Sequence, residues 1–226
     1  MKNQYFGDNK DLFTYDLILQ ILHAGLVEHF TFIPMLTSND DKGHGEKYSR
    51  DKAKAGTENK ELMRFLDECV KEGRRDIEQL ESFFKKGAIE MTIYRGKDEY
   101  FSHQQRREYF EQIGDGLLSK SLVFVDPDVG LEVKKSGQEH MLYAEVKNLY
   151  QRMDESSILM IYQYFPRRHR QQYLNTRCAE LKEKITGDWP VCIDDGEIAF
   201  FFLTRDKSLE HSLTHVISDY AACYGE

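Results

Sequence analysis

The sequence predicts an α/β protein with a doubly wound, mostly parallel Rossmann-like sheet that ends in a C-terminal antiparallel hairpin. Three observations support this fold class. In the second half of the chain, short apolar segments alternate with segments of helical period, as in parallel strands joined by helices. Residues 121–126 (SLVFVD) are apolar up to the final aspartate, which is typical of a strand covered on both faces. Asp195-Gly196 between two apolar segments is a strong hairpin signal.

The expected elements follow from apolar periodicity and from the residues that start or stop them. Strands are predicted over residues 29–33, 90–94, 121–126, 157–163, 191–194 and 198–203. Helices are predicted over residues 12–22, 57–72, 77–84, 102–118, 136–150, 168–185 and 209–222. The polar segment 37–56 has no period and contains glycine, so it is expected to be a long loop with a role as a lid.

Length and composition are consistent with one core. The chain has 226 residues, of which 40% are hydrophobic, and its charged residues are well spread. We therefore expect a single domain over residues 1–226, with a loop and helical insertion at about 37–88.

Charge, cysteine usage and hydropathy narrow the class of protein. The formal net charge is −8 and the isoelectric point is about 5.6, which argues against a general nucleic-acid binder. The four cysteines form no CxxC pair, and the pair His211 and His215 lacks a third ligand, so no metal site is predicted. No apolar segment approaches the roughly 20 residues of a membrane span, and no signal-peptide core is seen. A cytoplasmic protein without a membrane partner is expected.

The best candidate site follows the most apolar predicted strand. Asp126, Pro127 and Asp128 come directly after it, and ligands of open α/β sheets bind beyond the carboxyl ends of strands. The alternative is that the two acids only cap the next turn. Gln163 and Arg167 follow another predicted strand, and an arginine at a helix start can meet a phosphate-bearing ligand.

A second motif lies before the first helix, where Gly7, Asp8 and Asp11 form a GDxxD sequence. By itself this motif is better explained by a helix cap with a hydrophobic staple. With the segment Asp126–Val129 it carries a resemblance to the class I methyltransferase fold. The similarity is to large-subunit ribosomal RNA adenine-N6 methyltransferases, whose Asp-Pro-Pro-Tyr motif falls on Asp126–Val129. The chain also resembles a group of proteins without an assigned activity that share GDxxD and DPDxGxE motifs.

The resemblance implies S-adenosylmethionine as cofactor, bound near Gly7, Asp8, Asp11 and Thr37. It places Asp126, Pro127 and Asp128 in the catalytic position, facing an unidentified methyl acceptor. Gln163 and Arg167 then complete the substrate side of the crevice. Nucleic acid is one candidate acceptor.

The chain departs from this family in four places. Thr14-Tyr15 stands where the family has a lysine-histidine pair. A glycine-rich loop is missing after the first predicted strand, where Ile33 is followed by Pro34. Asp128 replaces a proline, and Val129 replaces the aromatic residue that would stack on a flipped base. A degenerate relative that no longer binds the cofactor is therefore an open alternative.

Two other classes of function stay open at this point. Pro127-Asp128 with the later Glu145 and Lys147 imitates the PD…ExK pattern of a metal-dependent nuclease, although Glu145 falls in a predicted helix. The third alternative is a non-catalytic interaction protein on the same fold, with a homodimer as one form.

Overall fold

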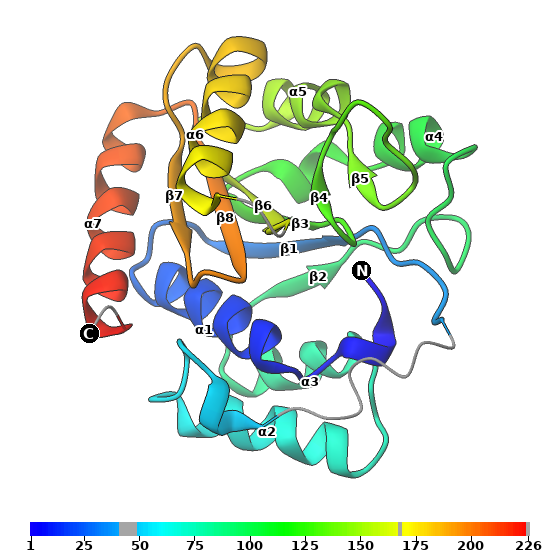
Figure 1. The fold of residues 1–226 in the computed structure, drawn as a ribbon, viewed down its shortest axis with the longest axis vertical. Coiled ribbons are helices and arrows are strands. Elements are labelled where there is room, and N and C mark those ends of the chain that lie inside the picture. Colours follow the sequence, from blue (N-terminus) through cyan, green and yellow to red (C-terminus); the bar gives the residue numbers. More distant parts are fainter. Residues whose placement is uncertain (41–48, 167–168, 225–226) are drawn as a thin grey trace.

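The structure is a computed structural model that describes residues 1–40, 49–166 and 169–224. Its centre is a six-stranded sheet with the strand order β2-β1-β3-β6-β8-β7 (Figure 1). The parallel strands are β1 (His29–Pro34), β2 (Met91–Ile93), β3 (Ser121–Asp126) and β6 (Ile158–Tyr164).

The sheet ends in the hairpin of β7 (Val191–Asp194) and β8 (Ile198–Leu203). Strand β8 lies between β6 and β7 and runs antiparallel to both. Asp195 closes the turn, since its carboxylate accepts hydrogen bonds from the backbone N–H groups of Glu197 and Ile198. The α/β class, the mostly parallel sheet and the C-terminal hairpin are thereby confirmed.

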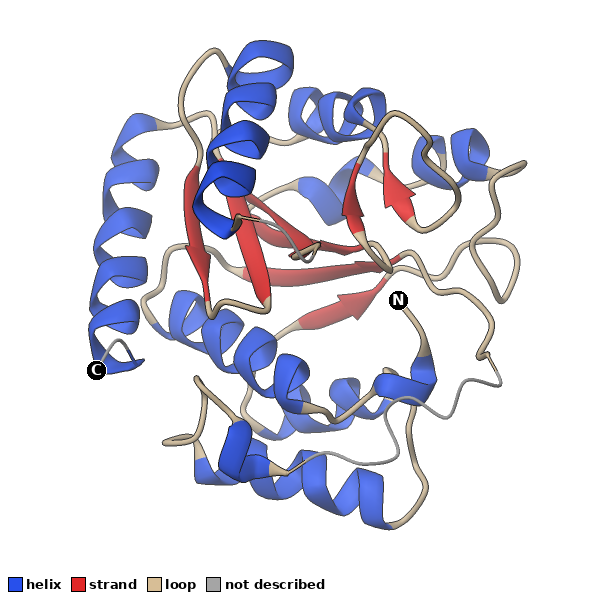
Figure 2. Cartoon of the chain, viewed as in Figure 1, coloured by secondary structure: helices blue, strands red, loops and turns tan. Residues whose placement is uncertain are grey.

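Helices cover both faces of the sheet (Figure 2). Each face has its own hydrophobic core. The first core is formed with α1 (Asn9–His23), α2 (Lys60–Lys71), α3 (Gln79–Lys86) and α7 (Lys207–Tyr224). The second core is formed with α4 (Arg106–Glu111), α5 (Tyr143–Arg152) and α6 (Arg170–Leu181). None of the helices in the described ranges is both long enough and apolar enough to cross a membrane.

The position of β3 between the two cores explains why its four central residues are all apolar. Leu122 and Phe124 point into the first core, whereas Val123 and Val125 point into the second. Successive side chains of a strand point to opposite faces, so a strand covered on both faces needs apolar residues at every position.

Two predicted helices are shorter than expected. The segment predicted as a helix over 102–118 contains only α4 and the 3₁₀ turn η3 (Asp115–Leu118), separated by residues 112–114. The helix predicted over 136–150 begins only at Tyr143. Before it, β5 (His140–Met141) pairs with β4 (Gly130–Leu131) in a small parallel sheet. The remaining short segments are η1 (Asn3–Tyr5), η2 (Arg50–Lys52) and the π turn η4 (Lys182–Thr186).

Candidate functional site

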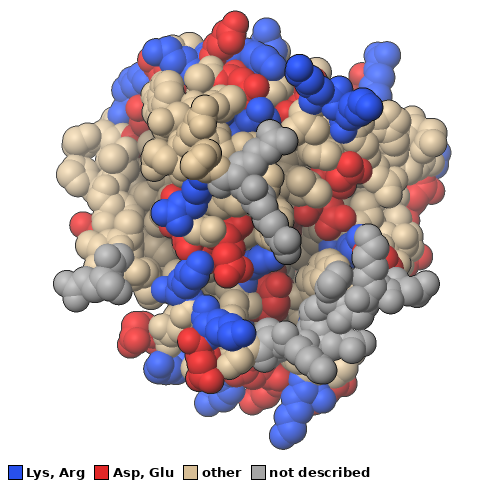
Figure 3. Space-filling model, in the orientation of Figure 1, with Lys and Arg blue, Asp and Glu red and all other residues tan. Residues whose placement is uncertain are grey.

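A cavity of about 380 Å³ lies beside the carboxyl end of β3 and the start of α1. Its walls come from the amino-terminal segment, the first turns of α1, the segment after β3 and the end of β6. Among the described residues, five aspartates and two lysines line it. These are Asp8, Asp11, Asp40, Asp126, Asp128, Lys2 and Lys10. The site is therefore rich in carboxyl groups. On the face shown in Figure 3, by contrast, acidic and basic side chains are mixed.

Asp126 ends β3 opposite Pro34 of β1, and only 8% of the residue is exposed. Its carboxylate has no hydrogen bond or ion pair with any other described residue, although its backbone carbonyl accepts a hydrogen bond from Met35 N–H. Burial raises the pKa of Asp126 to about 7; the Met1 amino group opposes this rise, and the Asp128 carboxylate adds to it. A buried carboxyl without a partner and with a pKa near neutrality is a candidate proton acceptor.

The GDxxD motif forms the start of α1. Asp8 is the N-cap, and its carboxylate accepts hydrogen bonds from Lys10 N–H at 2.8 Å and Asp11 N–H at 3.0 Å. The Asp11 carboxylate accepts a hydrogen bond from Gly7 N–H at 2.7 Å. Burial raises the pKa values of both Asp8 and Asp11, and the charge of Asp8 raises that of Asp11 further. The cap expected from sequence and the position beside the cavity are thus both present.

Gly7 has a structural role next to this cavity. Its φ is +90°, and a Cβ at this position would lie 2.6 Å from Val70 Cγ2 and 3.2 Å from the Leu66 carbonyl oxygen. We expect Gly7→Ala to lower the free energy of unfolding by about 1–3 kcal/mol, through backbone strain and overpacking.

Gly25→Ala is the matched control for this substitution. Gly25 has a φ of +68° with nothing within 4 Å of a built Cβ, so only the strain of about 1 kcal/mol is expected there. Urea unfolding measures both variants, and equal losses of stability would contradict the close approach of Val70.

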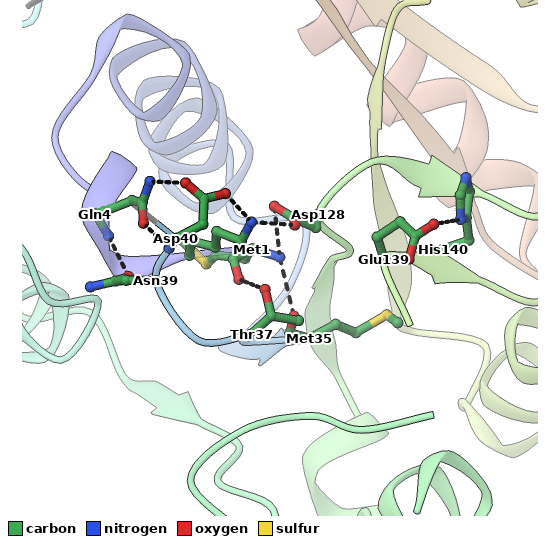
Figure 4. A network of polar contacts seen from close by, with 10 residues as sticks. Met1, Gln4, Met35, Thr37, Asn39, Asp40, Asp128, Glu139 and His140 are labelled. Carbon is green, nitrogen blue, oxygen red and sulfur yellow. Dashed lines mark hydrogen bonds and ion pairs between the residues drawn. The ribbon is translucent and has the colours of Figure 1, made fainter. Parts of the chain in front are cut away.

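The amino-terminal segment forms one wall of the cavity, and ion pairs hold it there (Figure 4). The Lys2 ammonium lies 2.7 Å from the Asp40 carboxylate and 3.5 Å from that of Asp128. Gln4 holds Asp40 through two hydrogen bonds, from its side-chain N–H₂ to the carboxylate at 3.0 Å and from Asp40 N–H to its side-chain oxygen at 2.6 Å. Lys2 therefore shows that a primary ammonium group fits between these acids.

Thr37, expected near the cofactor, is instead bound to the amino-terminal segment (Figure 4). Its backbone N–H and its hydroxyl both donate to the Met1 carbonyl oxygen, at 2.8 and 3.1 Å. Thr37 is buried and is not among the residues that line the cavity.

Tyrosines form the remaining walls of the site. Tyr162 and Tyr164 of β6 line the cavity, and the Lys10 ammonium lies 4.6 Å from the centre of the Tyr164 ring. Tyr15 lies deeper, and its fully buried hydroxyl has no hydrogen-bond partner among the residues that the structure describes. Burial raises the pKa of Tyr15, and the charges of Asp11 and Asp126 raise it further.

Gln163, predicted on the substrate side, points away from the cavity and supports the loop after β3. Its side chain accepts a hydrogen bond from Leu131 N–H and donates to the carbonyl oxygens of Val129 and Tyr164. A Cβ at Gly130 would lie 2.3 Å from the Gln163 amide nitrogen, so this contact requires glycine. Arg167 lies outside the described residues.

The acids of the nuclease pattern have other partners. Glu145 lies in α5 and forms a buried ion pair with Arg106, while the Asp128 carboxylate lies 3.5 Å from the Lys2 ammonium. Within the described ranges, no group of three or more histidine, cysteine, aspartate or glutamate side chains is placed to hold a metal ion.

The structure thus brings Asp8, Asp11, Asp126, Pro127 and Asp128 together. Several other lining residues were not predicted, namely Lys2, Tyr5, Lys10, Asp40, Tyr162 and Tyr164. Four of them had a signal in the sequence. Tyr5 and Lys10 belong to the candidate segment 5–11 that contains the GDxxD motif. The two tyrosines of β6 flank Gln163, and neighbours on a strand point to opposite faces. Comparison with known protein families, curated proteins and solved structures found no match.

Proposed function

We propose that this protein is an S-adenosylmethionine-dependent methyltransferase that acts on a nitrogen acceptor. One observation carries the proposal. The two motifs on which the resemblance rests, Gly7–Asp11 and Asp126–Asp128, are far apart in the sequence, yet Asp8, Asp11 and all three residues of the second motif line the same cavity.

The strand order supports this location for a ligand site. From β1 the sheet extends through β2 on one side and through β3 and β6 on the other, with helices on both faces. This pattern fits a doubly wound Rossmann-like fold, in which ligands bind beyond the carboxyl ends of the strands where the order reverses. That position is between Pro34 of β1 and Asp126 of β3, and the cavity lies beside it.

The acidic side chains of the cavity suit a cationic cofactor. Its volume of about 380 Å³ falls within the usual range of about 300–1,000 Å³ for small-molecule sites. The excess of aspartates complements a sulfonium cation, and the Asp126 carboxylate makes no hydrogen bond or ion pair with another described residue. Since Pro34 and Met35 stand where a glycine-rich loop is expected, binding would depend on the carboxylates of Asp8, Asp11 and Asp126.

The bound cofactor would supply an electrophilic methyl group, and the chain would position the acceptor and remove its proton. Asp126 is suited to accept that proton, because its pKa of about 7 keeps a useful fraction ionised near neutral pH. Asp128 and Tyr164 would hold the acceptor amine by charge and by the face of the ring. Placement of the acceptor nitrogen in line with the methyl group accounts for most of the acceleration.

Calorimetric titration with S-adenosylmethionine and S-adenosylhomocysteine tests the proposal. We expect micromolar binding, with the cationic methyl donor bound more tightly than the neutral product. Asp126→Asn should reduce this preference, whereas Asp219→Asn, an exposed aspartate of α7, should leave it unchanged. Absence of binding by both ligands would overturn the proposal and favour a non-catalytic interaction protein. Heat from Mg²⁺ alone would favour the nuclease alternative.

A further inference from the structure

A second and larger hollow adjoins the acidic cavity. It has a volume of about 1,500 Å³ and lies between the small β4–β5 sheet and α6. Val129 and Tyr164 line both this groove and the acidic cavity, so they form the boundary between the two. The Tyr164 side chain is partly exposed at this boundary, since 42% of the residue is accessible.

The groove has the opposite charge from the cavity. The ammonium groups of Lys134, Lys135 and Lys184 line it without an ion pair to any described residue, and Lys184 lies 4.0 Å from the centre of the Tyr143 ring. Its acids, in contrast, are engaged. Glu132 accepts a hydrogen bond from Tyr143 N–H, and Glu180 accepts one from the Tyr143 hydroxyl and pairs with Arg177.

Arg177 provides an independent sign of a ligand. Its side chain is only 9% exposed, and its two terminal nitrogens are used, one on the Glu132 carbonyl oxygen at 2.6 Å and one on the Glu180 carboxylate at 2.7 Å. The remaining nitrogen, Nε, is buried without a partner among the described residues. A buried donor left unsatisfied costs free energy, and an anion that reached Nε through movement of the neighbouring side chains would relieve that cost.

We propose that the groove binds the phosphate-bearing body of an aliphatic amine, whose ammonium group reaches past Tyr164 into the acidic cavity. Basic and acidic side chains are separated between the groove and the cavity. Three unpaired lysines line the groove, aspartates surround the adjoining cavity, and the same two residues border both. The role of this amine as methyl acceptor rests on the proposed function, but its binding does not.

Methyl transfer to this amine requires only the amine, the sulfonium methyl donor and the Asp126 carboxylate. The ammonium first gives a proton to the Asp126 carboxylate, which frees the nitrogen lone pair. That lone pair forms the new N–C bond while the S–C bond of the sulfonium breaks and its electron pair stays on sulfur. The products are a methylated ammonium and S-adenosylhomocysteine, and the Asp126 proton leaves to solvent.

The test uses the full chain and a series of ω-aminoalkyl phosphates with two to six carbons. Inorganic phosphate and the matching alkylamines serve as single-group probes. We expect at least one aminoalkyl phosphate to bind about tenfold more tightly than either single-group probe. The double variant Lys134→Gln with Lys135→Gln should weaken this binding about tenfold and leave S-adenosylhomocysteine binding unchanged.

Lys71→Gln with Lys85→Gln is the matched control, because both lysines are exposed, lie on α2 and α3, and change the net charge equally. Equal binding of phosphate and all aminoalkyl phosphates would overturn the inference. So would binding of a single-stranded oligonucleotide without binding of any aminoalkyl phosphate, which would favour a nucleic-acid acceptor. Binding of an aminoalkyl phosphate without either cofactor form would uphold the site and refute the methyltransferase.

Discussion

Replacement of Arg106 by methionine is expected to destabilise the fold by about 3–5 kcal/mol, because it leaves the buried Glu145 carboxylate without its counter-charge. Arg106 and Glu145 are each 8% exposed. The guanidinium donates to both Glu145 oxygens, at 2.5 and 2.9 Å, and to the His140 carbonyl oxygen at 2.7 Å. Urea unfolding of Arg106→Met against the parent chain measures the loss.

The double variant Arg106→Met with Glu145→Met distinguishes an uncompensated charge from lost packing. Replacement of both members of a buried ion pair by apolar residues is often close to neutral, so this variant should recover much of the lost stability. The cycle is meaningful because the two side chains are in direct contact. If the double variant is less stable than Arg106→Met, the isolated Glu145 charge is not the cause of the loss.

The same pair has a consequence for the basic groove. Arg106 holds the carbonyl oxygen of His140, and His140 belongs to β5 and lines the groove. Glu145 also accepts a hydrogen bond from Leu142 N–H and so fixes the start of α5. Strand β5 and the start of α5, both beside the groove, therefore depend on the Arg106–Glu145 ion pair, which lies outside both binding sites.

The fold class could be predicted because the strongest signals are local. Continuous apolarity of 121–126, helical period in 12–22 and the Asp195-Gly196 turn depend on neighbours in the chain. The small sheet of β4 and β5 could not be predicted. Its strands have two residues each, and their pairing depends on contacts such as that between Gln163 and Leu131.

The candidate site was predictable only in part. Asp126 could be located because it ends a predicted strand, and Asp8 because it precedes a predicted helix. Asp40 and Lys2 had no signal, since their approach depends on the path of the segment after β1. Gln163 was assigned to the substrate side because it ends a strand; the sequence does not say which face of a strand covered on both sides meets the ligand.

Asp126→Asn is expected to make the folded protein more stable at pH 8 while it removes the proton acceptor. In the unfolded chain an aspartate titrates at the ordinary value of 3.8, whereas burial raises the pKa of Asp126 in the folded protein to about 7. The folded state therefore binds the proton more tightly, and ionisation of Asp126 opposes folding. The loss of folding stability caused by ionisation of Asp126 is absent below about pH 4. It grows as the pH rises between the two pKa values and is constant above about pH 7.

The size of this effect follows from the difference between the two pKa values. About three units at 1.36 kcal/mol each give a penalty on the order of 4 kcal/mol above pH 7. Asparagine carries no charge, so the stability gained in Asp126→Asn should increase by roughly 2–3 kcal/mol between pH 5 and pH 8. Urea unfolding at several pH values measures this, with Asp219→Asn as the exposed control. Parallel pH profiles for Asp126→Asn and the parent would show that the carboxylate is not held at a cost to folding. Profiles that diverge as expected would mean that the chain keeps a destabilising charge at the end of β3. Functional residues are often retained in this way although they lower the stability of the fold.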